Sequence, residues 1–244
     1  MQKFPPPQMY TVKLSEKEVL NDKFIEFHFE LVEPNKIEFI AGQYVSFIVS
    51  EKEERRSYSI SSSPKLAHGF KITLDITPDG LGVQFFKNLE FGQEVKVLGP
   101  LGNFVLQDEP KEDSIVFIAT GSGVAPFHSM ILDLLQNNSE SSTKDTRNIT
   151  LYWGLRHAED MIWQDEFQEL AQDFPRFQFH PVLSKAQQEW PLCRGHVTDC
   201  VGIHDLPENA GFYLCGAKQM IADVQKVLLK RGVQQEAIHY EKFD

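Results

Sequence analysis

The sequence is poor in cysteine. Its 244 residues include only Cys193, Cys200 and Cys215, which are too few for the disulfide framework of a small secreted protein. They are also too few for an iron–sulfur cluster, which takes four thiolate ligands. The first residues contain no apolar core of the kind that a secretory signal peptide has. These absences favour a cytoplasmic protein without an iron–sulfur centre in this chain.

Long apolar runs and an excess of positive charge are also lacking. No apolar stretch is long enough to span a bilayer. Lys and Arg number 24 against 35 Asp and Glu, which gives a formal net charge of −11. Nucleic-acid phosphates would repel such a chain, so a nucleic-acid partner is disfavoured. Hydrophobic residues make up 41% of the sequence, which is ordinary for a globular protein.

The N-terminal part of the chain has the pattern of a β-barrel. Residues 24–31, 44–49 and 70–76 alternate apolar and polar side chains, as half-buried strands do. Turn signals at short spacing separate the strands, at residues 33–35, 78–80 and 99–102. Many short strands with such turns are typical of an antiparallel barrel.

The pattern changes after the polar stretch 107–113. The run 115–119 is continuously apolar, like a parallel strand buried on both faces. Further strands are expected at 149–153, 177–183 and 212–215, and helices from Pro126 onward and at 164–172 and 218–230, with a polar loop at 137–147. Strands that alternate with helices predict an open parallel sheet. We therefore expect two domains, residues 1–110 and 111–244, with the boundary near Pro110.

The segment Arg56-Ser57-Tyr58-Ser59 combines three useful side chains. Arginine can clamp a phosphate with two hydrogen bonds, tyrosine offers a flat face with a polar tip, and serine is a small donor and acceptor. In a strand, residues 56 and 58 share one face and residues 57 and 59 the other. Taken alone, the segment is better interpreted as a plain strand that ends in a serine-rich turn.

Two glycine-containing turns lie where helices are expected to begin. The first is Gly80-Leu81-Gly82-Val83, and a helix that opens there would offer free N–H groups to a phosphate. The second consists of Thr120, Gly121, Ser122, Gly123, Val124, Ala125 and Pro126, between a buried strand and a helix. Its glycines would let a pyrophosphate approach the backbone. The next strand ends at Arg156 without an acidic residue, which disfavours the usual Rossmann fingerprint.

These motifs are followed by Tyr213-Leu214-Cys215-Gly216 and by the ending Glu241-Lys242-Phe243-Asp244. In this order they resemble the ferredoxin–NADP reductase superfamily, flavoproteins that pass a hydride from NAD(P)H to FAD. The resemblance covers nearly the whole chain. It implies an antiparallel Greek-key β-barrel that binds FAD, residues 1–110, followed by an open parallel-sheet α/β domain that binds NAD(P), residues 111–244.

The resemblance also implies roles for individual residues. Arg56 is expected at the FAD pyrophosphate, Tyr58 stacked on the flavin and Ser59 at flavin N5. The remaining cofactor-binding residues are expected to be Ser57, Gly80, Leu81, Gly82, Val83, Thr120 to Pro126, Cys215, Gly216, Met220 and Phe243. Ser59, Cys215 and Glu241 are the expected catalytic residues. Val83 and Asp75 depart from the family, which commonly has Ser or Thr and a basic residue there, and Asp244 extends past the terminal aromatic.

Four residues bear on the choice between NADPH and NADH. A 2′-phosphate needs positive charge, and Arg156, Ser184, Lys185 and Arg194 lie at or beyond expected strand ends. The same residues could be ordinary solvated side chains, as exposed Lys and Arg usually are. We expect a preference for NADPH, with NADH as the alternative.

A metal site is the competing interpretation of one segment. Cys193, His196, Cys200 and His204 lie close together in the sequence, which could indicate zinc. The same region loosely resembles the family's Trp-x-Gly-x-x-Gly-x-Val in a loop and strand, at residues 190–197. We therefore predict no metal.

The expected function is transfer of a hydride from NAD(P)H to bound FAD, with electrons passed to a separate acceptor. Ferredoxin, flavodoxin, an oxygenase component or a small molecule could accept them, and the ending Tyr240-Glu241-Lys242-Phe243 resembles oxygenase reductases. A free-flavin reductase is one alternative, although such enzymes typically lack the tyrosine found at Tyr58. A non-enzymatic electron-transfer subunit of a dehydrogenase complex is another, although such subunits usually carry a cysteine cluster.

Overall fold

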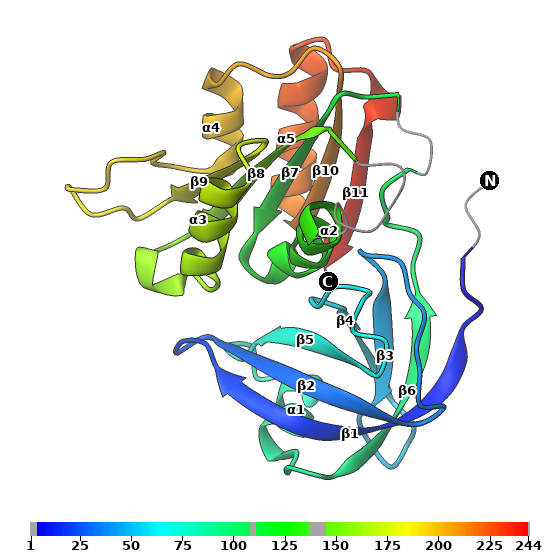
Figure 1. Cartoon of the computed structure of the whole chain (residues 1–244). Coiled ribbons are helices and arrows are strands. Elements are labelled where there is room, and N and C mark those ends of the chain that lie inside the picture. The colour runs from blue at the N-terminus through cyan, green and yellow to red at the C-terminus, as the bar shows by residue number, and fades with distance from the viewer. Residues whose placement is uncertain (1–3, 108–110, 137–144, 244) are drawn as a thin grey trace. The chain divides into compact units, whose positions relative to one another are not determined.

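The computed structural model describes residues 4–107, 111–136 and 145–243 (Figure 1). The chain forms two compact units. The first comprises Met1–Asp108 with Ala125–Ser141, and the second comprises Glu109–Val124 with Ser142–Asp244. Most of the predicted polar loop at 137–147, and Asp244, lie outside the described residues. Each unit is described below by itself.

The first unit contains a six-stranded antiparallel sheet. Its strands are β1 (Gln8–Val19), β2 (Phe24–Glu33), β3 (Tyr44–Ile48), β4 (Arg55–Ser59), β5 (Gly69–Asp75) and β6 (Glu94–Leu101). They are ordered β4-β3-β6-β1-β2-β5. An antiparallel bridge between Ile60, just after β4, and Ile72 of β5 joins the two ends of this order. This is the antiparallel barrel that the sequence predicts.

Phenylalanine side chains fill the barrel core. Phe27 and Phe29 alternate with outward residues along β2, and both are buried with Phe47 and Phe70. Helix α1 (Leu81–Asn88) contributes Phe86, whose ring lies 5.0 Å from Phe47 and 5.1 Å from Phe27 between centroids. The helix is therefore anchored to the barrel through one fully buried aromatic side chain.

Helix α2 (Ala125–Gln136) belongs to the same unit. Pro126 is its second residue, which suits a position where the helix needs no N–H donor. It buries a row of apolar side chains, namely Phe127, Met130, Ile131, Leu134 and Leu135. His128 Nδ1 lies 2.8 Å from the Ser61 carbonyl oxygen, and the Ser129 hydroxyl donates to the Ser62 carbonyl at 2.6 Å.

The second unit is an open sheet of five parallel strands with helices on its faces. The strands are β7 (Ser114–Thr120), β8 (Asn148–Leu155), β9 (Phe177–Leu183), β10 (Ala210–Ala217) and β11 (Ile238–Phe243), in the order β11-β10-β7-β8-β9. The helices are α3 (Gln164–Asp173), α4 (Val197–Ile203) and α5 (Lys218–Lys230), with 3-10 turns at Gly121–Val124, Ala158–Asp160 and Gln235–Ala237.

The two faces of this sheet have different partners (Figure 1). Tyr152 packs in one apolar cluster with residues of α4 and α5, including Val201 and Val224. The next residue, Trp153, points to the other face and contacts Phe167 of α3, with ring centroids 6.3 Å apart. Strand alternation thus divides the α/β core into two layers of side chains.

The structure corrects three details. Helix α4 begins at Val197, where the sequence predicted a loop and a strand. Strands β1 and β11 were not anticipated, although residues 10–15 of β1 alternate apolar and polar side chains, which lie buried and half-buried in turn. Cys193 and Cys200 are joined in a disulfide, although the low cysteine content had suggested no disulfide framework. No helix among the described residues is long and apolar enough to cross a membrane.

Candidate active site

In the barrel unit, the start of α1 approaches β4 closely. A Cβ atom added to Gly82 would overlap the Tyr58 hydroxyl and would lie 3.1 Å from Arg56 Cγ. Only glycine permits this approach, because any other residue would displace the tyrosine tip. Arg56, Tyr58 and the first turn of α1 therefore form one cluster, although they are far apart in the sequence.

Tyr58 is held by aromatic neighbours. Its half-buried ring meets Phe86 edge-on, with centroids 5.0 Å apart and an interplanar angle of 88°, and Phe47 at 6.2 Å. Burial raises the pKa of Tyr58 to about 12, and the nearby Arg56 charge acts in the opposite direction. The hydroxyl therefore stays neutral at physiological pH. A neutral, fixed ring beside an exposed guanidinium suits a flat cofactor that carries phosphate groups.

The first turn of α1 can also receive an anion. Gly80 is its N-cap and makes no side-chain cap hydrogen bond, and no acidic residue lies in this turn. A Cβ atom at Gly80 would meet nothing within 4 Å. Because the first N–H groups of a helix have no partner inside the helix, this open end favours a phosphate.

Other barrel residues of the predicted site differ in exposure. Ser57 is exposed, whereas Ser59 is 7% exposed and pairs with Tyr44 of β3. The Asp75 carboxylate, where the family often has a base, accepts hydrogen bonds from the Thr77 backbone N–H at 2.9 Å and the Thr77 hydroxyl at 2.6 Å. Asp75 therefore closes a local turn.

In the α/β unit, the glycine-rich turn after β7 interlocks with the end of β10. A Cβ atom at Gly123 would collide with the backbone of Cys215 and Gly216, and one at Gly216, whose φ is +135°, would collide with Thr120. The Thr120 hydroxyl accepts a hydrogen bond from the Ala217 N–H at 3.2 Å. The sequence predicted both motifs, and the structure brings them into backbone contact.

Cys215 and Glu241 lie beside each other on neighbouring strands of this unit. Burial, together with the Glu241 charge, raises the pKa of the Cys215 thiol well above its ordinary value, so the thiol is protonated. Burial also raises the pKa of Glu241 to about 7. Glu241 Oε2 is buried and has no hydrogen-bond partner among the described residues. A buried polar atom of this kind marks a place where another group is expected.

The remaining predicted site residues differ in the unit to which they belong and in their burial. Ser59 belongs to the barrel unit, whereas Cys215 and Glu241 belong to the α/β unit. Met220 is 8% exposed and packs in the core between α5 and the sheet. Phe243 is partly buried at the end of β11 and pairs with Ala217.

The predicted nucleotide-selecting residues fall into two groups. The ends of β8 and β9 meet, because the Lys185 N–H donates to the Arg156 carbonyl at 2.9 Å and the Ser184 N–H donates to the Leu155 carbonyl at 3.0 Å. The side chains of Arg156 and Lys185 are exposed. The Arg194 guanidinium instead donates to the carbonyls of Gln188 and Trp190, at 2.5 and 2.8 Å, and closes its own loop.

Two family models match most of the chain. A family model described as an oxidoreductase FAD-binding domain matches residues 11–106, and one described as an oxidoreductase NAD-binding domain matches residues 117–226. The reductase component of phenol 2-monooxygenase from Pseudomonas sp. (strain CF600) is 32% identical over 221 residues, which cover 88% of this chain and 60% of that protein. The chain thus spans about 60% of the length of this relative.

Solved structures give the same picture of the fold. A cytochrome P450 reductase from Amycolatopsis has a TM-score of 0.86 and 28% identity, over 98% of this chain and 70% of that chain. A ferredoxin NADP+ reductase from Neisseria gonorrhoeae, solved with bound FAD and NADP, has a TM-score of 0.76 and 20% identity, over 98% and 99% of the two chains. The second likeness supports the two-domain fold alone.

Proposed function

Because this chain belongs to the ferredoxin–NADP reductase superfamily, we propose that it is an NAD(P)H-dependent flavoprotein reductase that supplies electrons to an oxygenase component. The observation that carries the proposal is the cluster of Arg56, Tyr58 and Gly82, in which a glycine is required for close approach. The cluster supports an FAD site because it lies in the part of the chain that matches an FAD-binding family.

The barrel residues fit FAD by their chemistry. The Arg56 guanidinium and the open N–H groups of α1 would hold the pyrophosphate. The Tyr58 ring would pack against the flavin, and the Ser59 hydroxyl would bond its N5. The rest of the FAD site would be lined by Ser57, Gly80, Leu81 and Val83. FAD, when bound, would supply the chemistry that accepts a hydride and releases single electrons.

The α/β residues fit a nicotinamide nucleotide. The N–H groups and glycines of residues 121–124 would hold the pyrophosphate. Cys215 and Gly216 would border the nicotinamide, and Phe243 would be an aromatic contact for the cofactor. Glu241, with a pKa of about 7, can hold or release a proton at Oε2 near neutral pH. Such a group suits general acid–base work.

An oxygenase component is the proposed acceptor because similar proteins carry that role in their names. They include the phenol 2-monooxygenase component and a propane 2-monooxygenase reductase component from Gordonia sp. (strain TY-5), which is 29% identical over 98% of this chain. Ferredoxin and flavodoxin are the acceptors to compare it with.

The test uses neighbouring arginines. Arg56→Ala should lower the FAD content of the purified protein, whereas Arg55→Ala should not, because Arg55 contacts Met9 and lies outside the Gly82 cluster. Under anaerobic conditions NADPH or NADH should bleach the yellow wild-type protein, and acceptors would then be screened for reoxidation. A wild-type protein that binds no FAD, or full FAD content in Arg56→Ala, would count against the proposal.

A further inference from the structure

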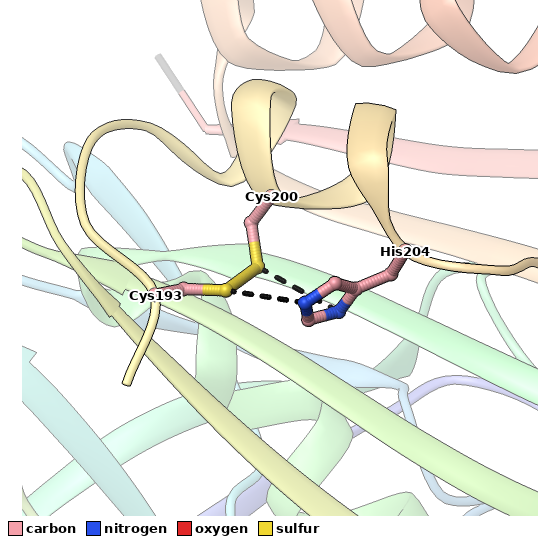
Figure 2. A group of neighbouring side chains, drawn as sticks. All are labelled: Cys193, Cys200 and His204. Atoms are coloured by element: carbon pink, nitrogen blue, oxygen red, sulfur yellow. Dashed lines mark hydrogen bonds between the residues drawn. A yellow bond between two sulfur atoms is a disulfide. The ribbon is translucent and has the colours of Figure 1, made fainter. Parts of the chain in front are cut away.

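A second group of reactive side chains lies in the α/β unit. Figure 2 shows Cys193, Cys200 and His204 pointing toward one another, and their potential ligand atoms all lie within 4.8 Å. Cys200 is buried, while Cys193 and His204 are partly exposed. Two sulfurs and an imidazole nitrogen are the ligand types that Zn²⁺ prefers.

The backbone fixes all three residues. Cys200 and His204 are four residues apart, at α4 and its C-cap, so they lie on one side of the helix. The Arg231 guanidinium donates to the carbonyl of His204 at 2.6 Å and holds this helix end. Cys193 is tied to β9, because its carbonyl accepts the Leu183 N–H at 3.1 Å. The group is thus prepared by secondary structure and does not depend on side-chain rotamers alone.

His204 is oriented as a ligand would be. Its Nδ1 lies 3.1 Å from the Tyr152 hydroxyl and 3.9 Å from Cys200 Sγ, and its Nε2 lies 3.5 Å from Cys193 Sγ. Histidines that bind metals generally donate the other ring N–H to a fixed acceptor, which sets the tautomer. With Tyr152 as acceptor for Nδ1–H, the lone pair on Nε2 is directed to Cys193.

We propose that the reduced form of this group binds one Zn²⁺ ion through Cys193, Cys200 and His204. In a tetrahedral zinc site, a sulfur and a nitrogen lie about 3.6 Å apart and two sulfurs about 3.8 Å apart. The distance from Cys193 Sγ to His204 Nε2 already matches the first value. The fourth position is left to water, which can reach the partly exposed side of the group.

Oxidation controls this site. In the structure Cys193 and Cys200 share a disulfide, which leaves no thiolate for a metal. A thiol or phosphine reductant gives two electrons to the S–S bond, and with two protons this yields two thiols. Zn²⁺ then replaces those two protons. The metal therefore binds only after reduction, and bound Zn²⁺ protects the pair from oxidation.

The sequence pattern contains a second histidine that the structure excludes from the site. His196 is exposed at the start of α4, where its backbone N–H donates to the Asp199 carboxylate at 2.9 Å. A change of its side chain leaves this bond intact. His196→Gln is therefore the matched control for His204→Gln.

The experiment titrates Co²⁺, as a spectroscopic substitute for Zn²⁺, into the full-length protein reduced with a phosphine under anaerobic conditions. Wild type should bind one equivalent with a near-ultraviolet thiolate charge-transfer band, and Zn²⁺ should displace it. Cys193→Ser and His204→Gln should weaken binding by at least about tenfold, and Tyr152→Phe by about tenfold through lost orientation. His196→Gln should bind like wild type.

Oxidation provides the second measurement. Diamide-treated protein should show one free thiol after denaturation, that of Cys215, and should not bind Co²⁺ at this site. Reduced protein should show three. Circular dichroism checks that each variant is folded. The proposal is overturned if the reduced wild type shows no thiolate band, or if His204→Gln and His196→Gln bind equally well.

Discussion

Cys215 of β10 and Glu241 of β11 are register partners in adjacent parallel strands, so a buried thiol and a half-buried carboxyl are neighbours. Neither has its ordinary acidity, because burial disfavours the charged form of both. The Glu241 carboxyl therefore changes charge near neutral pH, and this titration should have a measurable effect on the stability of the folded protein.

Glu241 should make the folded protein more stable in mild acid. Its folded pKa of about 7 lies above the ordinary value of 4.5, so the native state binds more protons between these values. This contribution is complete below about pH 4.5 and is lost as the pH rises through 7. The size of the pKa shift limits this contribution to the free energy of unfolding to about 3 kcal/mol. Between pH 5 and pH 8, the free energy of unfolding measured in urea should fall more for wild type than for Glu241→Gln. An equal fall in the two proteins would disprove the assignment.

Gly82→Ala should weaken FAD binding through a steric effect that can be reversed. The new methyl group overlaps the Tyr58 hydroxyl, and the next nearest atoms are the Cγ and Cβ of Arg56, at 3.1 and 3.4 Å. We expect an affinity loss of at least about tenfold, or about 1.4 kcal/mol. Removing the hydroxyl in Tyr58→Phe/Gly82→Ala should restore part of the affinity. Fluorescence titration of the four proteins of this cycle measures the coupling, and additive losses would show that the hydroxyl is not the obstacle.

Cys215→Ala and Ser59→Ala should slow flavin reduction more than they weaken nucleotide binding. Each position is proposed to act beside the reacting groups, and an interaction made only in the transition state affects turnover rather than affinity. A tenfold slower rate corresponds to about 1.4 kcal/mol. Stopped-flow absorbance under anaerobic conditions, at several NADPH concentrations, separates the two effects. Reduction at wild-type rates in both variants would remove these residues from the mechanism.

Arg156→Ala should lower kcat/KM for NADPH by about tenfold and leave NADH almost unaffected. An exposed guanidinium at the end of β8 can bond a 2′-phosphate, and such charge-assisted bonds contribute more than neutral ones. Arg194→Ala is the comparison, because the Arg194 guanidinium is already bonded to loop carbonyls. Steady-state kinetics with both nucleotides decides the matter. An equal loss for NADH and NADPH in Arg156→Ala would mean that Arg156 does not select the nucleotide.

The sequence predicted the elements that have a strong local pattern. The apolar run at 115–119 and the helix at 218–230 were expected and lie within or coincide with β7 and α5. The short helix α4 was missed, because its seven residues include Thr198, Cys200 and Gly202, which are poor helix formers. Packing of α4 against α5, not local propensity, determines this helix.

The candidate sites, too, were predictable only where the local sequence pattern carries them. The motif residues Arg56 and Tyr58 were visible in the sequence, but the dependence of their cluster on Gly82 required the approach of α1 to β4. The Cys and His pattern at residues 193–204 was visible too, but we predicted no metal there, and the pattern included His196 and omitted Tyr152. Which histidine faces the cysteines depends on where α4 begins, and this is decided by tertiary contacts.

The position of α2 has a consequence for any attempt to divide this chain. The barrel unit consists of two sequence segments, with β7 and the glycine-rich turn between them assigned to the other unit. A fragment that stops near Pro110 would leave the Ser61 and Ser62 carbonyls without His128 and Ser129. No single cut of the gene therefore yields two intact halves, and a chimera that exchanges the flavin module with a relative must carry residues 125–136 along with it.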